Sequence, residues 1–98
     1  MKWTVILENE RRESLESLSD EFSFESIHSE TIQNSFILLK YLDPYGDTFF
    51  NSLQMQDLIF DLQKLKDLEK ENPLIKDIII LAERCKVQPH TYLSFYGD

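Results

Sequence analysis

The sequence predicts a single α+β domain spanning residues 1–98: a small antiparallel or mixed sheet of three to four strands, with two helices packed on one face. Three observations predict this fold. The 98 residues are 42% hydrophobic, which is ample for one core. Segments near both ends alternate apolar and polar residues, as half-buried strands do. Two apolar stripes with helical spacing lie between residues 51 and 89.

The first predicted element is a strand over residues 2–8, in which Trp3, Val5 and Leu7 alternate with more polar positions. Asn9-Glu10-Arg11 follows as a turn. Residues 12–34 are rich in serine, which favours turns and caps over helix interiors. We therefore expect a hairpin return strand near 12–18 followed by a loop. A short helix over 13–22 is the alternative, because Leu15, Leu18 and Phe22 have helical spacing.

The run Phe36-Ile37-Leu38-Leu39-Lys40-Tyr41-Leu42 is almost continuously apolar. A run of this length and character predicts a central strand that is covered on at least one face. The following Asp43-Pro44-Tyr45-Gly46-Asp47 has the composition of a tight turn.

Two helices are predicted next. Asn51, with Gln54 three residues later, resembles a capping box and opens the first helix. Its core stripe comprises Met55, Leu58, Ile59, Leu62, Leu65 and Leu68, and its water-facing positions are Gln56, Asp57, Asp61, Lys64 and Asp67. Asn72 as cap and Pro73 at the first helical position open the second helix, which Pro89 ends.

A last strand is predicted from His90 to Tyr96 because polar and apolar residues alternate there. Thr91, Leu93 and Phe95 share one face, and His90, Tyr92, Ser94 and Tyr96 share the other. The single cysteine, Cys85, continues the apolar stripe of the second helix, which indicates a buried thiol in a reducing, cytoplasmic setting.

The net charge of −8 favours some partners over others. Residues 1–34 carry three Lys or Arg against eight Asp or Glu, so the acidity is densest there. Phosphate backbones and anionic membranes would repel such a chain, and no apolar run is long enough for a membrane span. A basic protein is the favoured partner, unless the charge serves solubility alone. With two glycines, no phosphate-binding loop can be formed, and we expect no cofactor.

The candidate partner-binding residues are acidic side chains near the N-terminus, with tyrosines as anchors. They are Glu13, Glu16, Asp20, Glu21, Tyr41, Tyr92 and Tyr96. Tyrosine buries a large area at low entropic cost, and carboxylates at the rim steer a cation toward it. This surface is open if the helices cover the other sheet face, and closed if residues 12–34 fold over it.

An alternative site comes from the tripeptide Tyr-Gly-Asp, which occurs at residues 45–47 and 96–98. If the strands before the two copies are neighbours, Asp43, Asp47, His90 and Asp98 could meet. Such oxygen ligands suit Mg²⁺ or Ca²⁺, and carboxylates in unequal surroundings can do acid–base chemistry. The same residues are also ordinary turn formers, so the main hypothesis assigns no metal and no catalytic residue.

One pattern in the sequence resembles a family of small uncharacterised bacterial proteins. It consists of Leu42-Asp43-Pro44-Tyr45-Gly46-Asp47-Thr48, Asn51, Leu53-Gln54-Met55 and His90-Thr91-Tyr92-Leu93, with Phe95-Tyr96-Gly97-Asp98 at the end. In size and acidity the chain also resembles the immunity proteins of bacterial toxin systems. We therefore expect a non-enzymatic acidic domain, an immunity or antitoxin-like inhibitor of a basic partner. The alternatives are a small metal-dependent or acid–base enzyme using the four residues above, and a structural homodimer.

Overall fold

A four-stranded antiparallel sheet with helices on one face forms the framework of the protein. The computed structural model describes residues 2–25 and 30–97. The strands are β1 (Trp3–Asn9), β2 (Ser14–Ser17), β3 (Asp47–Asn51) and β4 (Thr91–Gly97), in the order β2-β1-β4-β3. The helices are α1 (Glu30–Asn34), α2 (Met55–Leu68) and α3 (Leu74–Val87), with short 3₁₀ helices at Leu39–Tyr41 and Ser52–Gln54. The α+β prediction is confirmed.

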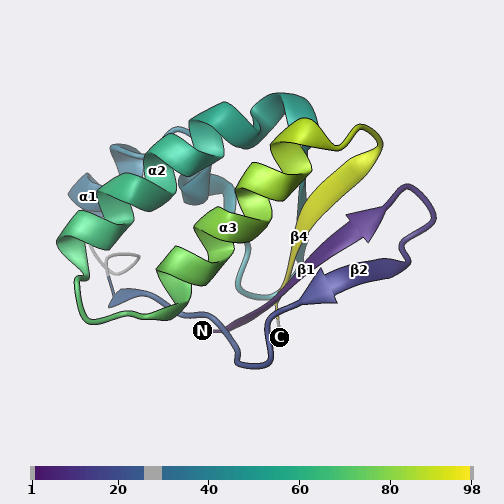
Figure 1. The fold of residues 1–98 in the computed structure, drawn as a ribbon. Helices are drawn as coiled ribbons and strands as arrows, with labels where there is room; N and C mark the ends of the chain where they lie inside the picture. The colour runs from purple at the N-terminus through teal and green to yellow at the C-terminus, as the bar shows by residue number, and fades with distance from the viewer. Residues whose placement is uncertain (1, 26–29, 98) are drawn as a thin grey trace.

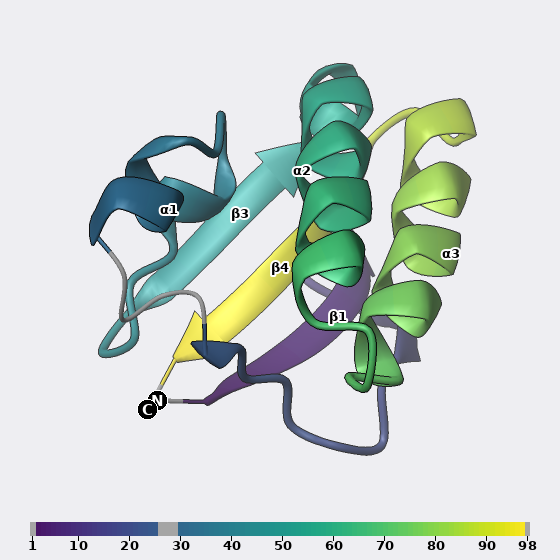
Figure 2. The ribbon, with the colours of Figure 1, turned by 90° about the vertical axis from the view of Figure 1, so that its left-hand side faces the viewer.

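The core lies between the sheet and the pair formed by α2 and α3, which run side by side across one sheet face (Figures 1 and 2). Alternate residues of β1 and β4 point into it: Trp3, Val5 and Leu7 from β1 and Thr91, Leu93 and Phe95 from β4 are all buried. The stripes of both helices meet them, as their 3.6-residue spacing predicts. The predicted core position of Leu68 is wrong: this residue ends α2 beyond the sheet-facing part of the stripe and is 49% exposed. No helix in the described ranges is long and apolar enough to cross a bilayer.

The two ends of the chain form the central strands of the sheet. β1 and β4 pair over their whole length, from Trp3 opposite Gly97 to Asn9 opposite Thr91. The start of β1 and the end of β4 therefore lie side by side at one end of the sheet (Figure 2). Pairing between such distant segments cannot be read from local patterns, yet it decides which side chains share a face.

The β1–β2 hairpin is present, and the alternative helix over 13–22 is wrong. The side-chain oxygen of Asn9 accepts hydrogen bonds from the backbone N–H groups of Arg11 and Glu13, which satisfies the turn. Arg12 has a φ of 64°, which lies in the left-handed region. This backbone conformation costs conformational free energy for any residue other than glycine. Beyond β2 the chain bridges back to Trp3 at Phe22, and Phe22 stacks in the core.

The predicted central strand over residues 36–42 is wrong. This segment forms turns and a 3₁₀ helix (Leu39–Tyr41), and the third strand is Asp47–Asn51. Phe36, Leu39 and Leu42 are buried while Tyr41 is 63% exposed, so the burial repeats every three residues instead of every two. The apolar run had no clean alternation, and its length alone did not distinguish a strand from a helical turn.

Asp61 explains why this segment stays out of the sheet, and its predicted water-facing position is wrong. The Asp61 side chain is fully buried in α2 and accepts hydrogen bonds from the backbone N–H groups of Ile37, Leu38 and Leu39, at 3.0, 2.6 and 3.0 Å. The carboxylate thus provides acceptors for three backbone N–H groups, which in a strand would need carbonyl partners on a neighbouring strand.

The helix starts are partly as predicted. The Asn51–Gln54 capping box is confirmed: each side chain accepts from the other residue's backbone N–H, at 3.1 and 2.9 Å. The first turn after it is 3₁₀, and the α-helix proper begins at Met55. Asn72 does not cap α3. Its side chain donates to the backbone carbonyl of Ser23 at 2.9 Å, which ties the helix connection to the N-terminal segment.

Candidate functional site

The sheet face opposite the helices carries alternate side chains of three strands, and we call these nine residues the open face. They are Thr4, Ile6, Glu8, Asp47, Phe49, Asn51, Tyr92, Ser94 and Tyr96. The register places Glu8 beside Tyr92, and Ile6 and Phe49 on either side of Ser94. Since α2 and α3 lie on the other face, the open-surface alternative for the tyrosines is the one observed (Figure 1).

A buried carboxylate lies on the open face. Glu8 is 4% exposed, although its face carries no helix in the described residues. Its two oxygens accept hydrogen bonds of 2.6 Å from the hydroxyls of Ser94 and Tyr96. Burial, followed by the hydrogen bond to Glu8 and the negative charge of Glu8, raises the pKa of Tyr96 to about 12. The phenol therefore remains a donor to the carboxylate at neutral pH.

Arg12 covers this carboxylate from the hairpin turn. Its guanidinium carbon lies 4.0 Å from the centroid of the Phe49 ring and 5.2 Å from that of Tyr92. The Arg12 Nη1 atom lies 3.8 Å from Glu8 Oε1. Phe49 in turn packs edge-to-face with Tyr96, with ring centroids 5.7 Å apart. The open face thus holds a cation above a negative charge and between aromatic rings, which is an arrangement that favours guanidinium.

Nucleophilic catalysis does not fit this cluster. Ser94 is fully buried, so a substrate could not reach its hydroxyl. Cys85 is also fully buried, as its position on the apolar stripe predicts, and burial raises the pKa of its thiol. Neither side chain offers the exposed, activated nucleophile that covalent catalysis needs.

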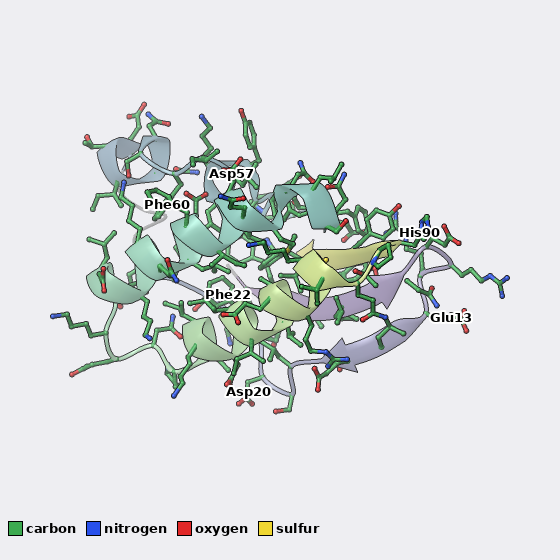
Figure 3. All side chains as sticks on the ribbon, turned by 45° about the horizontal axis from the view of Figure 1, so that its top comes forward. Glu13, Asp20, Phe22, Asp57, Phe60 and His90 are labelled. Carbon is green, nitrogen blue, oxygen red and sulfur yellow. The ribbon has the colours of Figure 1, made fainter. Side chains whose placement is uncertain are left out.

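The four acidic residues that the sequence predicts to bind a partner lie on the outer edge of the sheet. Glu13 and Glu16 belong to the hairpin, Asp20 and Glu21 to the loop after it, and all four are exposed. Figure 3 shows Glu13 and Asp20 pointing outward on this side, with Asp57 and Phe60 across the molecule on α2. Glu16 forms an ion pair with Arg84 of α3.

The structure separates the predicted tyrosine anchors. Tyr92 and Tyr96 lie half-buried on the open face, as predicted. Tyr41 was expected to join them from a central strand, but the strand is absent and Tyr41 lies in the 3₁₀ helix that packs beside α2. Its exposed ring is therefore not part of the open face.

The alternative site is only partly assembled. The two Tyr-Gly-Asp copies do meet, since the Gly97 N–H donates to the Gly46 carbonyl at 2.8 Å, and Asp47 lies opposite Tyr96. His90, however, precedes the other end of β4, where its Nδ1 atom lies 3.6 Å from Glu10. Asp98 lies outside the described residues. Across residues 2–25 and 30–97, no group of three or more His, Cys, Asp or Glu could hold a metal ion.

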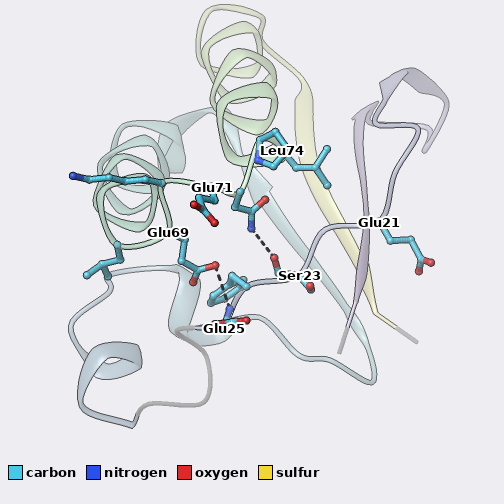
Figure 4. Close-up of a pocket in the computed structure, with 11 residues that line it drawn as sticks. Glu21, Ser23, Glu25, Glu69, Glu71 and Leu74 are labelled. Carbon is cyan, nitrogen blue, oxygen red and sulfur yellow. Dashed lines mark hydrogen bonds between the residues drawn. The ribbon is translucent and has the colours of Figure 1, made fainter.

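A hollow of about 610 Å³ lies where the connection between α2 and α3 meets residues 21–25 (Figure 4). Its polar groups bind across it: Glu69 accepts from the Glu25 N–H at 3.2 Å, and Asn72 donates to the Ser23 carbonyl. Four glutamates line it, including Glu21 and Glu71. These contacts attach residues 21–25 to the connection between α2 and α3. We therefore interpret the hollow as a structural feature and not as a ligand site.

Sequence reasoning missed the residues at the centre of the open face. Glu8 and Ser94 each occupy a strand position whose alternation places it opposite the core, and Arg12 follows in the turn. That alternation was the available signal. It could not show burial, because burial depends on the pairing of β1 with β4 and β3.

Compared with known protein families, curated proteins and solved structures, the chain has no significant match.

Proposed function

We propose that the protein is a non-enzymatic binding domain that docks a basic protein partner, in the manner of an immunity or antitoxin-like inhibitor. One observation supports this most: in the described part of the chain, every Asp and Glu except Glu8, Asp61 and Glu69 is exposed. The carboxylates form a dispersed negative surface instead of surrounding an ion. Such a surface attracts a cationic protein over long range and speeds its association.

The docking surface combines the acidic edge with the open face. The edge supplies Glu13, Glu16, Asp20 and Glu21 for steering, and the open face supplies Tyr92 and Tyr96 as anchors. Aromatic anchors contribute most of the affinity in protein interfaces, while rim charges mainly set the rate and the salt dependence. The proposal places the protein in the bacterial cytoplasm, where Cys85 stays reduced.

The test is affinity capture from the native host with two variants of matched charge. One variant reverses the acidic edge: E13K, E16K, D20K and E21K. The control reverses four exposed carboxylates elsewhere: D67K, E71K, D77K and E83K. Thermal unfolding first confirms that both variants fold.

We expect the unmodified chain and the control to retain one basic partner and the edge variant to lose it. Association should slow about tenfold or more between low and physiological ionic strength. Equal loss of the partner in both variants, or capture of an acidic partner, would contradict the proposal. A gene for a basic toxin-like protein beside this one would identify the partner to test first.

The two other functions have less support. An enzyme that uses Asp43, Asp47, His90 and Asp98 would need these groups together, and His90 lies at the opposite end of β4 from Asp47. A homodimer paired through β2 would rest on an exposed strand of only four residues that carries Glu16, and short charged edges oppose pairing. Light scattering at two concentrations checks for dimers.

A further inference from the structure

The Glu8 cluster, by which we mean Glu8, Phe49, Tyr92 and Tyr96, has the parts of an arginine-binding site. Glu8 supplies a negative charge held in place by two donated hydrogen bonds of 2.6 Å. Phe49 and Tyr92 supply ring faces at 4.0 and 5.2 Å from a guanidinium carbon. A planar guanidinium can stack on such rings and reach the carboxylate at once, whereas an ammonium cannot stack.

Arg12 fills this site only loosely. The 3.8 Å between its Nη1 atom and Glu8 Oε1 is longer than the 2.7–2.9 Å of a charge-assisted hydrogen bond. The Arg12 side chain is also 49% exposed. Its backbone φ of 64° is one that residues with side chains rarely adopt. The carboxylate is therefore incompletely neutralised by its own chain.

The hairpin does not need the Arg12 side chain to keep its shape. The turn is held by Asn9, whose side-chain oxygen accepts from the N–H groups of Arg11 and Glu13 at 2.9 and 3.1 Å. The Arg12 backbone N–H donates to the Asn9 carbonyl at 3.0 Å. The guanidinium can consequently leave the Glu8 cluster while the backbone of the turn stays in place.

We propose that the Glu8 cluster is an arginine-binding site, occupied by Arg12 in the free protein and by an arginine of the basic partner in the complex. This inference rests on the proposed function and names what the open face binds. The partner's arginine would displace Arg12, and Arg12 would move into solvent. The open face thereby selects for arginine over lysine, while the acidic edge attracts both residues equally.

The test uses hexa-arginine and hexa-lysine peptides as probes and two alanine variants. Arg12→Ala vacates the cluster. Arg11→Ala is the matched control, because it removes the same charge from the same turn and its guanidinium has no contact with Phe49 in the described structure. Dissociation constants are measured by calorimetry, and the amide resonances of Phe49 and Tyr96 report where the peptide binds.

We expect Arg12→Ala to bind hexa-arginine about tenfold more tightly than Arg11→Ala, because a site that the chain's own side chain partly occupies has a reduced apparent affinity for an added ligand. Both variants should bind hexa-lysine equally. Equal affinity of the two variants for hexa-arginine, or an equal gain for hexa-lysine, would overturn the inference.

A second substitution in the Arg12→Ala background tests the cluster itself. Glu8→Gln removes the charge and keeps one of the two acceptor oxygens, so that one hydroxyl still donates to residue 8 and the other can accept from its amide N–H. Phe49→Leu removes the ring while preserving the apolar contact. Either one should abolish the gain in affinity for hexa-arginine. If Glu8→Gln fails to fold, Phe49→Leu still tests the inference. A gain in affinity for hexa-arginine that persists in the Phe49→Leu variant would overturn it.

The two proposals can fail separately. A captured partner whose dissociation rate is the same from the Arg12→Ala and Arg11→Ala variants would overturn the arginine site and leave the binding function standing. Selective binding of hexa-arginine without any basic partner in the host would support the site and contradict the proposed function.

Discussion

Gly97, at the end of β4, packs closely against the backbone of residues 43–46, which precede β3. A Cβ atom there would lie 2.6 Å from the carbonyl oxygens of Asp43 and Gly46 and 2.7 Å from that of Pro44. These are backbone atoms, which cannot rotate away. We expect Gly97→Ala to lower the free energy of unfolding by about 2 kcal/mol, as overpacking does. Urea unfolding followed by Trp3 fluorescence measures it, because the Trp3 indole N–H donates to the Asp43 carbonyl.

Gly46→Ala is the matched control for this substitution. Its Cβ would meet Asp43 Oδ2 at 2.7 Å, which is an atom of an exposed side chain that can shift. A smaller loss is therefore expected. Equal losses in the two variants would show that the carbonyls around Gly97 yield more easily than their geometry indicates.

Tyr96 provides a prediction about pH. Because its pKa is raised from 10.0 to about 12, the unfolded chain loses the phenolic proton before the folded one does. The stability due to this group is thus complete below pH 10 and is lost as the pH rises toward 12. Ultraviolet titration should show one tyrosine ionising later than the rest.

Two variants check that late ionisation. Tyr96→Phe should abolish it, and Glu8→Gln should move it to lower pH, because the carboxylate opposes a neighbouring phenolate. Tyr92→Phe should leave it unchanged. A titration in which all four tyrosines ionise together would contradict the buried Glu8–Tyr96 contact.

At the scale of elements, Asp61 holds the segment before β3 against α2. Replacing it with alanine leaves the N–H groups of Ile37, Leu38 and Leu39 without their acceptor. We expect Asp61→Ala to cost on the order of 3 kcal/mol of unfolding free energy, because buried donors lose a charged partner. Asp67→Ala, an exposed change in the same helix, should cost less than about 0.5 kcal/mol.

Thermal unfolding measures both Asp61→Ala and Asp67→Ala. Hydrogen exchange adds a local readout, since the amides of Ile37 to Leu39 should lose protection in Asp61→Ala before those of β4 do. Uniform loss of protection across the sheet would indicate that Asp61 supports the whole fold instead of this segment.

The elements that were predicted correctly have strong internal periods. β1 and β4 alternate with period two, and α2 and α3 carry long apolar stripes. The segment over residues 36–42 has a high apolar content without a clear period, and it was assigned wrongly. Its structure depends on Asp61, which lies more than twenty residues away in sequence. Local reasoning had no access to that contact.

At the scale of the whole molecule, the net charge of −8 opposes compaction. Salt screens this repulsion, since the Debye length falls to about 3 Å at about 1 M. We therefore expect the melting temperature to rise with added NaCl, and to rise equally with KCl. The D67K, E71K, D77K and E83K variant, whose net charge is zero, should respond less. A melting temperature that falls with salt would show that the ion pairs outweigh the repulsion.

Local sequence patterns predict the α+β class, both long helices, the strands that become β1 and β4, and the acidic character of the surface. Each of these follows from composition or from a period contained within a few turns or a few strand residues. The same patterns also place Tyr92 and Tyr96 on one face.

Which polar residues are buried, and which of them meet, depends on how distant segments pair and pack. The Glu8 cluster requires β1, β3 and β4 to be in register, and the position of His90 requires the direction of β4 relative to Asp47. This is because hydrogen bonds between strands join residues that are distant in sequence, whereas propensity and periodicity depend only on residues that are near one another in sequence.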